Sequence, residues 1–306
     1  MMRSLLFVPG DSRRKMEKAL ASQADALILD MEDSVALTRK DEARTVITSF
    51  LAAAIDLDRR PRLIVRINSL DTGLSDDDIA AIVPGRPDAV LLPKACSGAD
   101  IQDLGARLAA KEAEAGLAEG TIAIHALMTE NATSMFNGAT FGRSSARLRA
   151  IAWGAEDLAA DIGASANRDE NGRYTDVFRL ARSLVLLAAA KAGVEAIDTV
   201  FTDFRDPDGL RKECLAAVRD GFSGKLAIHP DQVDVINQAF TPPPEDVERA
   251  VQILALFAAA GEDVGVLSLD GKMIDRPHLR QAERVARRAG LDPTALPFGP
   301  PVDRSA

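Results

Sequence analysis

The sequence is poor in several features, and each shortage excludes a class of protein. Only two of the 306 residues are cysteines, Cys96 and Cys214, which gives neither a disulfide framework nor a metal-type cysteine spacing. No apolar run approaches membrane-spanning length, and no apolar signal region precedes the first apolar run at residue 4. We therefore expect a cytoplasmic protein with no membrane partner.

Positive charge and aromatic residues are also scarce. The chain has 37 Lys and Arg against 46 Asp and Glu, a net charge of -9, which opposes a nucleic-acid partner because phosphate binding needs a basic surface. A small anionic ligand needs only local positive groups. Aromatics make up 4% of the residues and hydrophobic residues 47%. Small aliphatic side chains suit strands that are covered on both faces.

What the sequence does contain is a regular alternation of strand and helix patterns. Eight short apolar runs occupy residues 4–8, 26–30, 62–67, 88–92, 121–128, 149–154, 196–200 and 225–229. Helix patterns lie between them, at residues 98–114, 176–192 and 207–219 among others. Asp11 and Ser12 are placed to cap an earlier helix that runs through Ala21, and Thr38 to cap the next one, which carries apolar residues at 43–50. This alternation predicts an α/β fold, a (β/α)8 TIM barrel.

A doubly wound open sheet is the competing architecture. It ranks lower because no Gly-rich dinucleotide loop or Walker motif follows a strand. The predicted barrel domain takes residues 1–240. Residues 241–306 form a C-terminal helical extension, with helices at 245–260 and 277–289, a Gly/Asp-rich segment at 261–271 and a proline-containing tail.

Acidic residues follow two neighbouring strands of the predicted barrel. Glu130 comes after the fifth strand and Asp157 after the sixth, and all strand carboxyl ends of a parallel barrel open onto one face. Two carboxylates with room for waters and a chelating ligand are typical of a Mg²⁺ site. Taken alone, Asp157 could instead begin the following helix. Together with Glu130, it favours a metal.

Cationic residues at other strand ends offer anion sites. Arg66 ends the third strand and suits bidentate capture of a carboxylate, with a buried ion pair to Asp30, Glu32 or Asp33 as the alternative. Glu32 and Asp33 are expected to orient Arg66, Lys94 or a metal-bound water. Lys94 permits a Schiff-base role, but so many nearby acids favour an ion-paired lysine.

The start of the first predicted helix is basic. Arg13, Arg14 and Lys15 either hold a phosphate-bearing cofactor above the barrel mouth or form a solvated helix face.

Eight motifs, in order along almost the whole chain, carry a resemblance to a known family. They are RSLLFVPG at residue 3, DMEDSV at 30, VRIN at 65, PK at 93, GAEDL at 154, AIDTVFTDFRDPDGL at 196, GKLAIHP at 224 and DGKMID at 270. With these motifs the chain resembles the citrate lyase beta subunit-like family of the HpcH/HpaI aldolase superfamily.

The resemblance implies a Mg²⁺-dependent carbon-carbon lyase that cleaves or forms malyl, citramalyl or citryl thioesters. The products are an acetyl thioester and a 2-oxo acid. It places Glu130 and Asp157 on the metal ligands, Arg66 on the carboxylate-binding arginine, and Arg13, Arg14 and Lys15 near the phosphates of coenzyme A. Asp275 matches an aspartate that the family's C-terminal extension brings into a neighbouring subunit's site, which implies a homo-oligomer, a trimer or a pair of trimers.

Other activities on the same site remain open. The chain fits a citrate lyase beta chain that acts on citryl-acyl carrier protein, and also a malyl-CoA thioesterase or a malate synthase-type enzyme. Where the family pattern reads Glu-Thr-x-x-Gly, this chain has Glu130, Asn131 and Ser134. We expect Asn131 to cap the next helix, and Ser134 to narrow or polarise the space near the metal.

Overall fold

The computed structural model describes residues 2–55, 57, 59–261 and 264–294, which form two compact units. The larger unit is Met2–Asn237, and the smaller begins at Gln238. The boundary therefore falls inside the helix α9 (Gln232–Phe240), close to the end of the barrel domain expected at residue 240. Each unit has a hydrophobic cluster of its own.

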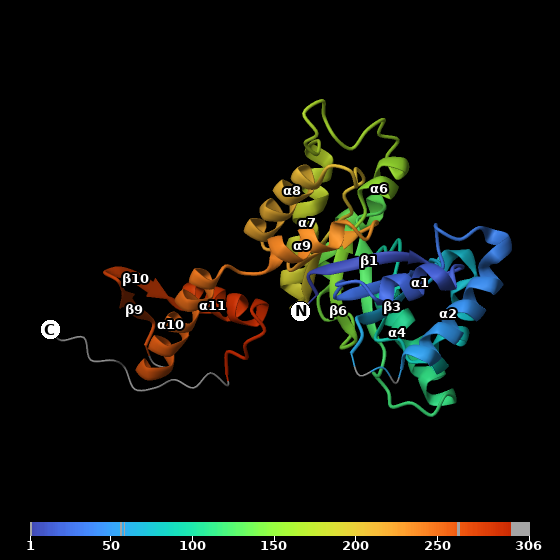
Figure 1. Cartoon of the computed structure of the whole chain (residues 1–306), viewed down its shortest axis with the longest axis horizontal. Helices are drawn as coiled ribbons and strands as arrows, with labels where there is room; N and C mark the ends of the chain where they lie inside the picture. Colours follow the sequence, from blue (N-terminus) through green and yellow to red (C-terminus); the bar gives the residue numbers. More distant parts are fainter. Residues whose placement is uncertain (1, 56, 58, 262–263, 295–306) are drawn as a thin grey trace. The chain divides into compact units, whose positions relative to one another are not determined.

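Eight parallel strands of the larger unit close into a barrel in which sequence neighbours pair and β8 pairs with β1. The strands are β1 (Ser4–Pro9), β2 (Ala26–Asp30), β3 (Arg62–Arg66), β4 (Ala89–Leu92), β5 (Ala123–Met128), β6 (Leu148–Trp153), β7 (Glu195–Asp198) and β8 (Gly224–Ala227). Each predicted run overlaps one of them, and Figure 1 shows helices packed around these strands. The predicted TIM barrel is confirmed.

The helices of this unit connect consecutive strands, as a parallel barrel requires. They are α1 (Arg13–Leu20), α2 (Lys40–Ala54), α3 (Ser75–Ile82), α4 (Gly98–Glu114), α5 (Ala132–Asn137), α6 (Ala155–Asp161), α7 (Asp176–Ala192) and α8 (Pro207–Asp220). Ser12 occupies the predicted N-cap position of α1, although its side chain makes no capping hydrogen bond. The predicted cap at Thr38 is wrong, because Thr38 lies in the 3-10 turn η1 (Leu37–Arg39) that leads into α2.

Small aliphatic side chains fill the barrel interior. Ala26, Ala89, Ala150 and Ala152 pack there with leucines and isoleucines from other strands. Side chains alternate between the two faces of a strand. Leu226 of β8 therefore joins this interior cluster, while Lys225 before it points outward and contacts Glu213 of α8. The scarcity of aromatic residues thus reflects the limited volume inside an eight-stranded barrel.

The smaller unit contains a hairpin that the sequence analysis did not predict. The elements of this unit are α10 (Pro244–Ala260), β9 (Val266–Leu269), β10 (Lys272–Asp275) and α11 (Arg276–Arg288), and β9 and β10 pair as the antiparallel hairpin. The hairpin turns at Asp270 and Gly271, which have φ of 50° and 70°, the left-handed geometry favoured by an Asp-Gly pair. The extension is therefore not purely helical. The last part of the predicted tail, from residue 295, lies outside the described residues.

In the described part of the chain, no helix is both long and apolar enough to cross a membrane.

Candidate active site

A pocket of about 450 Å³ opens at the carboxyl ends of the barrel strands. It is lined by Phe7, Val8, Pro9, Asp30, Asp33, Ser34, Arg66, Leu127, Glu130, Trp153, Gly154, Ala155, Glu156, Asp157, Thr199, Val200, Leu226 and Ile228. Four of the predicted site residues, Asp33, Arg66, Glu130 and Asp157, are in this lining. The barrel therefore brings together residues that are more than 120 positions apart, as its parallel topology predicted.

Arg66 is ion-paired with carboxylates of β2 and of the loop that follows β2. Its Nε and Nη2 donate to the two oxygens of Asp30, each at 2.7 Å, while Nη1 lies 2.7 Å from Glu32 Oε2 and 3.8 Å from Asp33 Oδ2. The guanidinium also stacks on the Phe7 ring, with Cζ 4.8 Å from the centroid. The ion pair considered as an alternative for Arg66 is present, and the guanidinium still lines the pocket.

Lys94 is ion-paired, as expected from the acids around it. Its ammonium contacts Glu32 and lies 3.4 Å from Asp157 Oδ1 and 3.8 Å from Asp33 Oδ2. Burial would lower the pKa of Lys94, but these carboxylates raise it above the ordinary lysine value. The side chain therefore stays protonated, which opposes a Schiff-base role.

Glu130 is a buried carboxyl with few compensating groups. It is 4% exposed, and Oε2 accepts a hydrogen bond of 2.5 Å from the backbone N–H of Lys94. Burial and the nearby charge of Asp157 raise the pKa of Glu130 to about 8. Glu130 is therefore mainly protonated at neutral pH, and a cation bound beside the two carboxyl groups would favour loss of that proton.

The backbone around these carboxylates is shaped to admit them. A Cβ at Gly154 would lie 2.7 Å from both Cγ and Oε1 of Glu130, so that only glycine leaves room for this side chain. Gly154 directly precedes α6, whose first turn carries Asp157.

Among the described residues, no group of three His, Cys, Asp or Glu side chains forms a metal-binding cluster. A metal here would need ligands beyond the two carboxylates.

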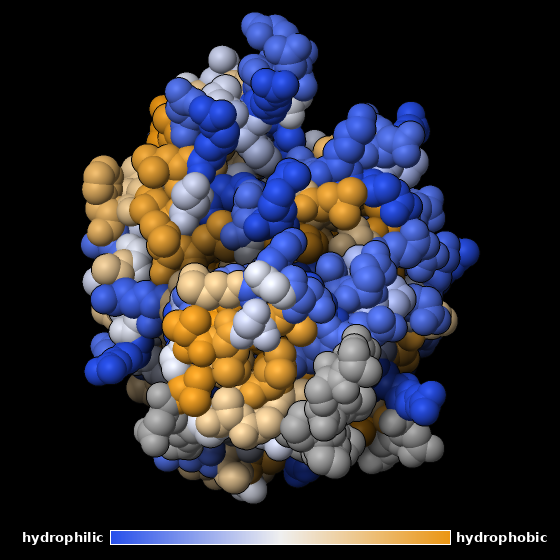
Figure 2. Space-filling view, turned by 90° about the vertical axis from the view of Figure 1, so that its left-hand side faces the viewer, coloured by the Kyte–Doolittle hydropathy of each residue, from blue (hydrophilic) through white to orange (hydrophobic). Residues whose placement is uncertain are grey.

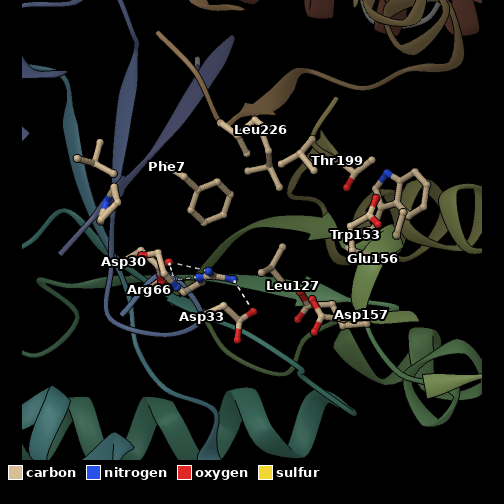
Figure 3. A pocket seen from close by; sticks show the side chains of 18 residues that line it. Phe7, Asp30, Asp33, Arg66, Leu127, Trp153, Glu156, Asp157, Thr199 and Leu226 are labelled. Atoms are coloured by element: carbon tan, nitrogen blue, oxygen red, sulfur yellow. Dashed lines mark hydrogen bonds and ion pairs between the residues drawn. The ribbon is translucent and has the colours of Figure 1, made fainter. Parts of the chain in front are cut away.

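Apolar side chains form the rest of the pocket wall. Phe7, Leu127, Val200, Leu226 and Ile228 come from four strands or from the loops after them. In Figure 3, the Phe7 ring and Leu127 lie beside Arg66, so that a ligand held by the charged groups also contacts an apolar surface. These side chains limit the access of water to such a ligand.

The remaining predicted residues are not in the pocket lining. Arg14 and Lys15 are exposed on α1. Arg13 Nε donates to Glu17 Oε1 on the same helix at 2.8 Å, and Arg13 Nη1 donates to Ser49 Oγ. Asp275 belongs to the smaller unit, where its side chain caps α11 in a reciprocal arrangement with His278. The His278 contact lowers the pKa of Asp275, so this carboxyl is ionised.

Sequence analysis missed the contribution of Gly154, and only grouped Asp30 among the acids near Arg66. The register that pairs Asp30 with Arg66 across β2 and β3 became visible only in the structure. No sequence pattern predicted the contact between Gly154 and Glu130, since it joins two different strand ends.

Known proteins are similar to this chain in sequence. The family model for HpcH/HpaI aldolase/citrate lyase matches residues 3–230. Citrate lyase subunit beta of Escherichia coli is 35% identical over 94% of this chain and 93% of its own, and a (3S)-malyl-CoA thioesterase of Cereibacter sphaeroides is 35% identical over 94% of both.

A solved structure extends the likeness to three dimensions. Protein CitE of Mycobacterium tuberculosis, in complex with magnesium, acetoacetate and coenzyme A, superposes with a TM-score of 0.73 at 33% identity, covering 94% of this chain and 98% of its own. The family model and these long alignments leave one conclusion: the chain belongs to the HpcH/HpaI aldolase/citrate lyase family.

Proposed function

We propose that this protein is a Mg²⁺-dependent carbon-carbon lyase acting on a 3-hydroxy-3-carboxy acyl thioester of coenzyme A, such as malyl-CoA or citramalyl-CoA. The products are acetyl-CoA and a 2-oxo acid, and the reverse condensation uses the same site. The observation that carries the proposal is the carboxyl pair Glu130 and Asp157, which lines the same pocket as Arg66. Family membership and a relative complexed with magnesium and coenzyme A support it.

The residues present fit a magnesium ion. Glu130 and Asp157 offer hard oxygen donors, which this ion prefers, and the charge of Asp157 helps to raise the pKa of Glu130, an effect that a bound cation would offset. Two protein carboxylates leave coordination positions for substrate oxygens and water. When bound, Mg²⁺ would polarise the hydroxyl and carboxylate oxygens of the substrate.

The protein side chains have separate tasks in cleavage. Arg66, fixed by Asp30, would orient the substrate carboxylate through its guanidinium, and Glu32 and Asp33 would hold Arg66 and Lys94 in place. Cleavage removes the hydroxyl proton and breaks the carbon-carbon bond, leaving a thioester enolate that takes a proton at carbon. The apolar wall of Phe7 and Leu127 would keep water from that carbon.

The substrate is identified by a panel of malyl-CoA, citramalyl-CoA and citryl-CoA, incubated with the full-length protein and Mg²⁺ and analysed by mass spectrometry. A lyase releases acetyl-CoA and the matching 2-oxo acid in equal amounts. Free coenzyme A with malate and no 2-oxo acid indicates a thioesterase, which the relative of that name makes the second candidate. Condensation of acetyl-CoA with a 2-oxo acid, followed by release of free thiol, indicates a synthase. Cleavage of citryl-acyl carrier protein alone indicates a citrate lyase beta chain.

We further propose that Asp275 works in a neighbouring subunit of a homotrimer or a pair of trimers. Its ionised carboxylate would act as the base that takes the proton from the acetyl thioester in condensation, and the protonated carboxyl formed in that step would act as the acid that protonates the enolate carbon in cleavage. The hairpin supports this role. Asp275 pairs with Val266, and both lie on the hairpin face opposite Ile274, which is buried in the core of the smaller unit. Val266 and Met273 on the outer face are 57% and 65% exposed. Figure 2 shows hydrophobic surface bordered by hydrophilic residues on the face that it presents.

Subunit mixing tests the shared site. Asp275→Asn and Glu130→Gln proteins, each inactive alone, should regain activity once subunits exchange, because some interfaces then combine an intact aspartate with an intact metal site. Failure of complementation despite proven exchange would refute the assignment of Asp275 to a neighbour. Arg13, Arg14 and Lys15 remain our candidates for the phosphates of coenzyme A, and charge reversal at Arg14 should raise the KM for the thioester.

We place the enzyme in the cytoplasm. Cys96 and Cys214 are both free thiols, and a reducing compartment maintains that state. Cell fractionation with antibody detection tests the location.

A further inference from the structure

The turn after β5 has an unusual backbone. Thr129, directly before Glu130, has a φ of 62°, although a β-branched residue strongly avoids the left-handed region. The residue is fully buried, and its own hydroxyl has no hydrogen-bond partner in the described structure. Something else must therefore hold this conformation.

Ser134 supplies that support. Its Oγ accepts the backbone N–H of Thr129 at 2.9 Å and donates to the backbone oxygen of Asn131 at 2.8 Å. Ser134 is completely buried and is not in the pocket lining. The expectation that it narrows or polarises the space near the metal is wrong, because the hydroxyl is turned into its own loop.

Asn131 connects this loop to the next strand end. Its Oδ1 caps α5 by accepting the N–H of Ser134 at 2.9 Å, as the sequence predicted, and its Nδ2 donates to the backbone oxygen of Lys94 at 3.3 Å. Lys94 is itself left-handed, with a φ of 53°. Its N–H in turn donates to Glu130 Oε2. The hydrogen bonds thus form a circuit that runs from the N–H of Thr129 through Ser134, Asn131 and Lys94 to the carboxyl of Glu130.

We propose that Ser134 is a positioning residue, whose hydroxyl fixes the turn at Thr129 and thereby aims the Glu130 carboxylate at the metal. The proposal rests on the proposed function, since it assumes that Glu130 binds the ion. Removing the hydroxyl leaves the N–H of Thr129 without its partner in a strained turn, and the direction of Glu130 is then no longer determined.

The test is metal affinity, measured by titrating the full-length apoprotein with Mn²⁺ and following free Mn²⁺ by electron paramagnetic resonance. Ser134→Ala should bind Mn²⁺ about 10-fold more weakly, the usual effect of losing a group that orients a ligand. The matched control is Ser144→Ala, because the buried Ser144 Oγ donates to the backbone oxygen of Phe141 at 2.9 Å over the same sequence separation. That variant should keep the affinity of the unmodified protein.

Steady-state kinetics add a readout that a purely structural role would not move. In Ser134→Ala the Mg²⁺ concentration for half-activation should rise, while kcat at saturating Mg²⁺ changes by less than about twofold. Equal losses of thermal stability in Ser134→Ala and Ser144→Ala, with equal metal affinities, would overturn the proposal.

A second variant covers the case in which Ser134→Ala does not fold. Asn131→Ser keeps an N-cap for α5 but cannot reach Lys94, so it should also weaken Mn²⁺ binding, by a smaller factor. Unchanged affinity in this variant would refute the circuit. If the unmodified protein bound no Mn²⁺ at all, the proposed function itself would fail, and the role of Ser134 with it.

Discussion

Two clusters of charged side chains in the barrel unit use the same residue types in different ways. The pocket cluster consists of Asp30, Glu32, Asp33, Arg66, Lys94, Glu130 and Asp157. The outer cluster is packed between β7, β8, α7 and α8 and consists of Asp198, Lys225, Arg182, Glu213 and Arg168. The pocket cluster lies at a cavity, whereas the outer cluster lies between the barrel and its helices.

In the outer cluster the carboxylates are matched by cations. Asp198 accepts from the Trp153 indole at 2.8 Å and pairs with both Arg182 and Lys225, while Glu213 pairs with Lys225 and Arg168. Burial would raise the pKa of Asp198, but the charges of Lys225 and Arg182 bring it below its ordinary value. This balance is what a structural network requires.

The pocket cluster has more acids than cations within ion-pairing distance. Arg66 and Lys94 are shared among Asp30, Glu32, Asp33 and Asp157, and the pKa of Glu130 is raised rather than lowered. An excess of acids over cations beside a cavity supports the proposed cation site. The comparison therefore predicts that substitutions in the pocket cluster affect chemistry, and those in the outer cluster affect stability.

The largest effect on turnover should come from the carboxylate pair. Glu130→Gln and Asp157→Asn should each reduce Mg²⁺-dependent turnover by about a thousandfold or more, because metal stabilisation contributes several kcal/mol. Both variants should remain folded by circular dichroism. Near-normal activity in either one would show that the pocket cluster does not hold the metal.

A single methyl group at Gly154 should have the next largest effect. Gly154→Ala places a Cβ against Glu130 Cγ and Oε1, and displacing a reacting group by about 1 Å can cost about 100-fold in rate. The φ of -120° at this position suits alanine, so thermal unfolding should change little. Ala155→Gly, one residue later, serves as a control for backbone changes in this segment.

Arg66→Lys should lower kcat/KM by roughly 10- to 100-fold, since an ammonium cannot replace a two-pronged contact to a carboxylate. Both a higher KM for the 2-oxo acid and a lower kcat are expected. Kinetics matching those of the unmodified enzyme would leave Arg66 with only its ion pair to Asp30.

Substitution in the outer cluster should change activity least. Lys225→Met leaves Asp198 buried with one cation fewer, so the free energy of unfolding in urea should fall by about 3 kcal/mol, with kcat per folded molecule nearly unchanged. Because the folded-state pKa of Asp198 is lowered, its pairing stabilises the protein above the ordinary carboxyl pKa of about 4 and is lost in more acidic solution. The stability difference between the two proteins should therefore narrow below that pH. A large loss of kcat at neutral pH would contradict the division between the clusters.

The two clusters were not equally visible in the sequence. Glu130, Asp157 and Arg66 stood out because each follows an apolar run, and parallel topology sends all such positions to one face. Asp198 and Lys225 occupy strand positions whose side chains point outward, where an isolated sequence gives no partner for them. The hairpin at Asp270 and Gly271 had a local turn signal, but its strands are short, and no neighbouring pattern fixed their pairing.

The sequence by itself determined the order of strands and helices, because apolar periodicity and helix length are local properties of the chain. It also determined which residues meet at the barrel mouth, since closing eight parallel strands leaves a single carboxyl-end face. Only the tertiary structure decided that Asp30 accepts two hydrogen bonds from the Arg66 guanidinium. The same holds for the space that Gly154 leaves for Glu130, and for the hydrogen bond between the Ser134 hydroxyl and its own turn. Those contacts depend on strand register and side-chain direction at angstrom scale, and neither is encoded in the spacing of residues along the chain.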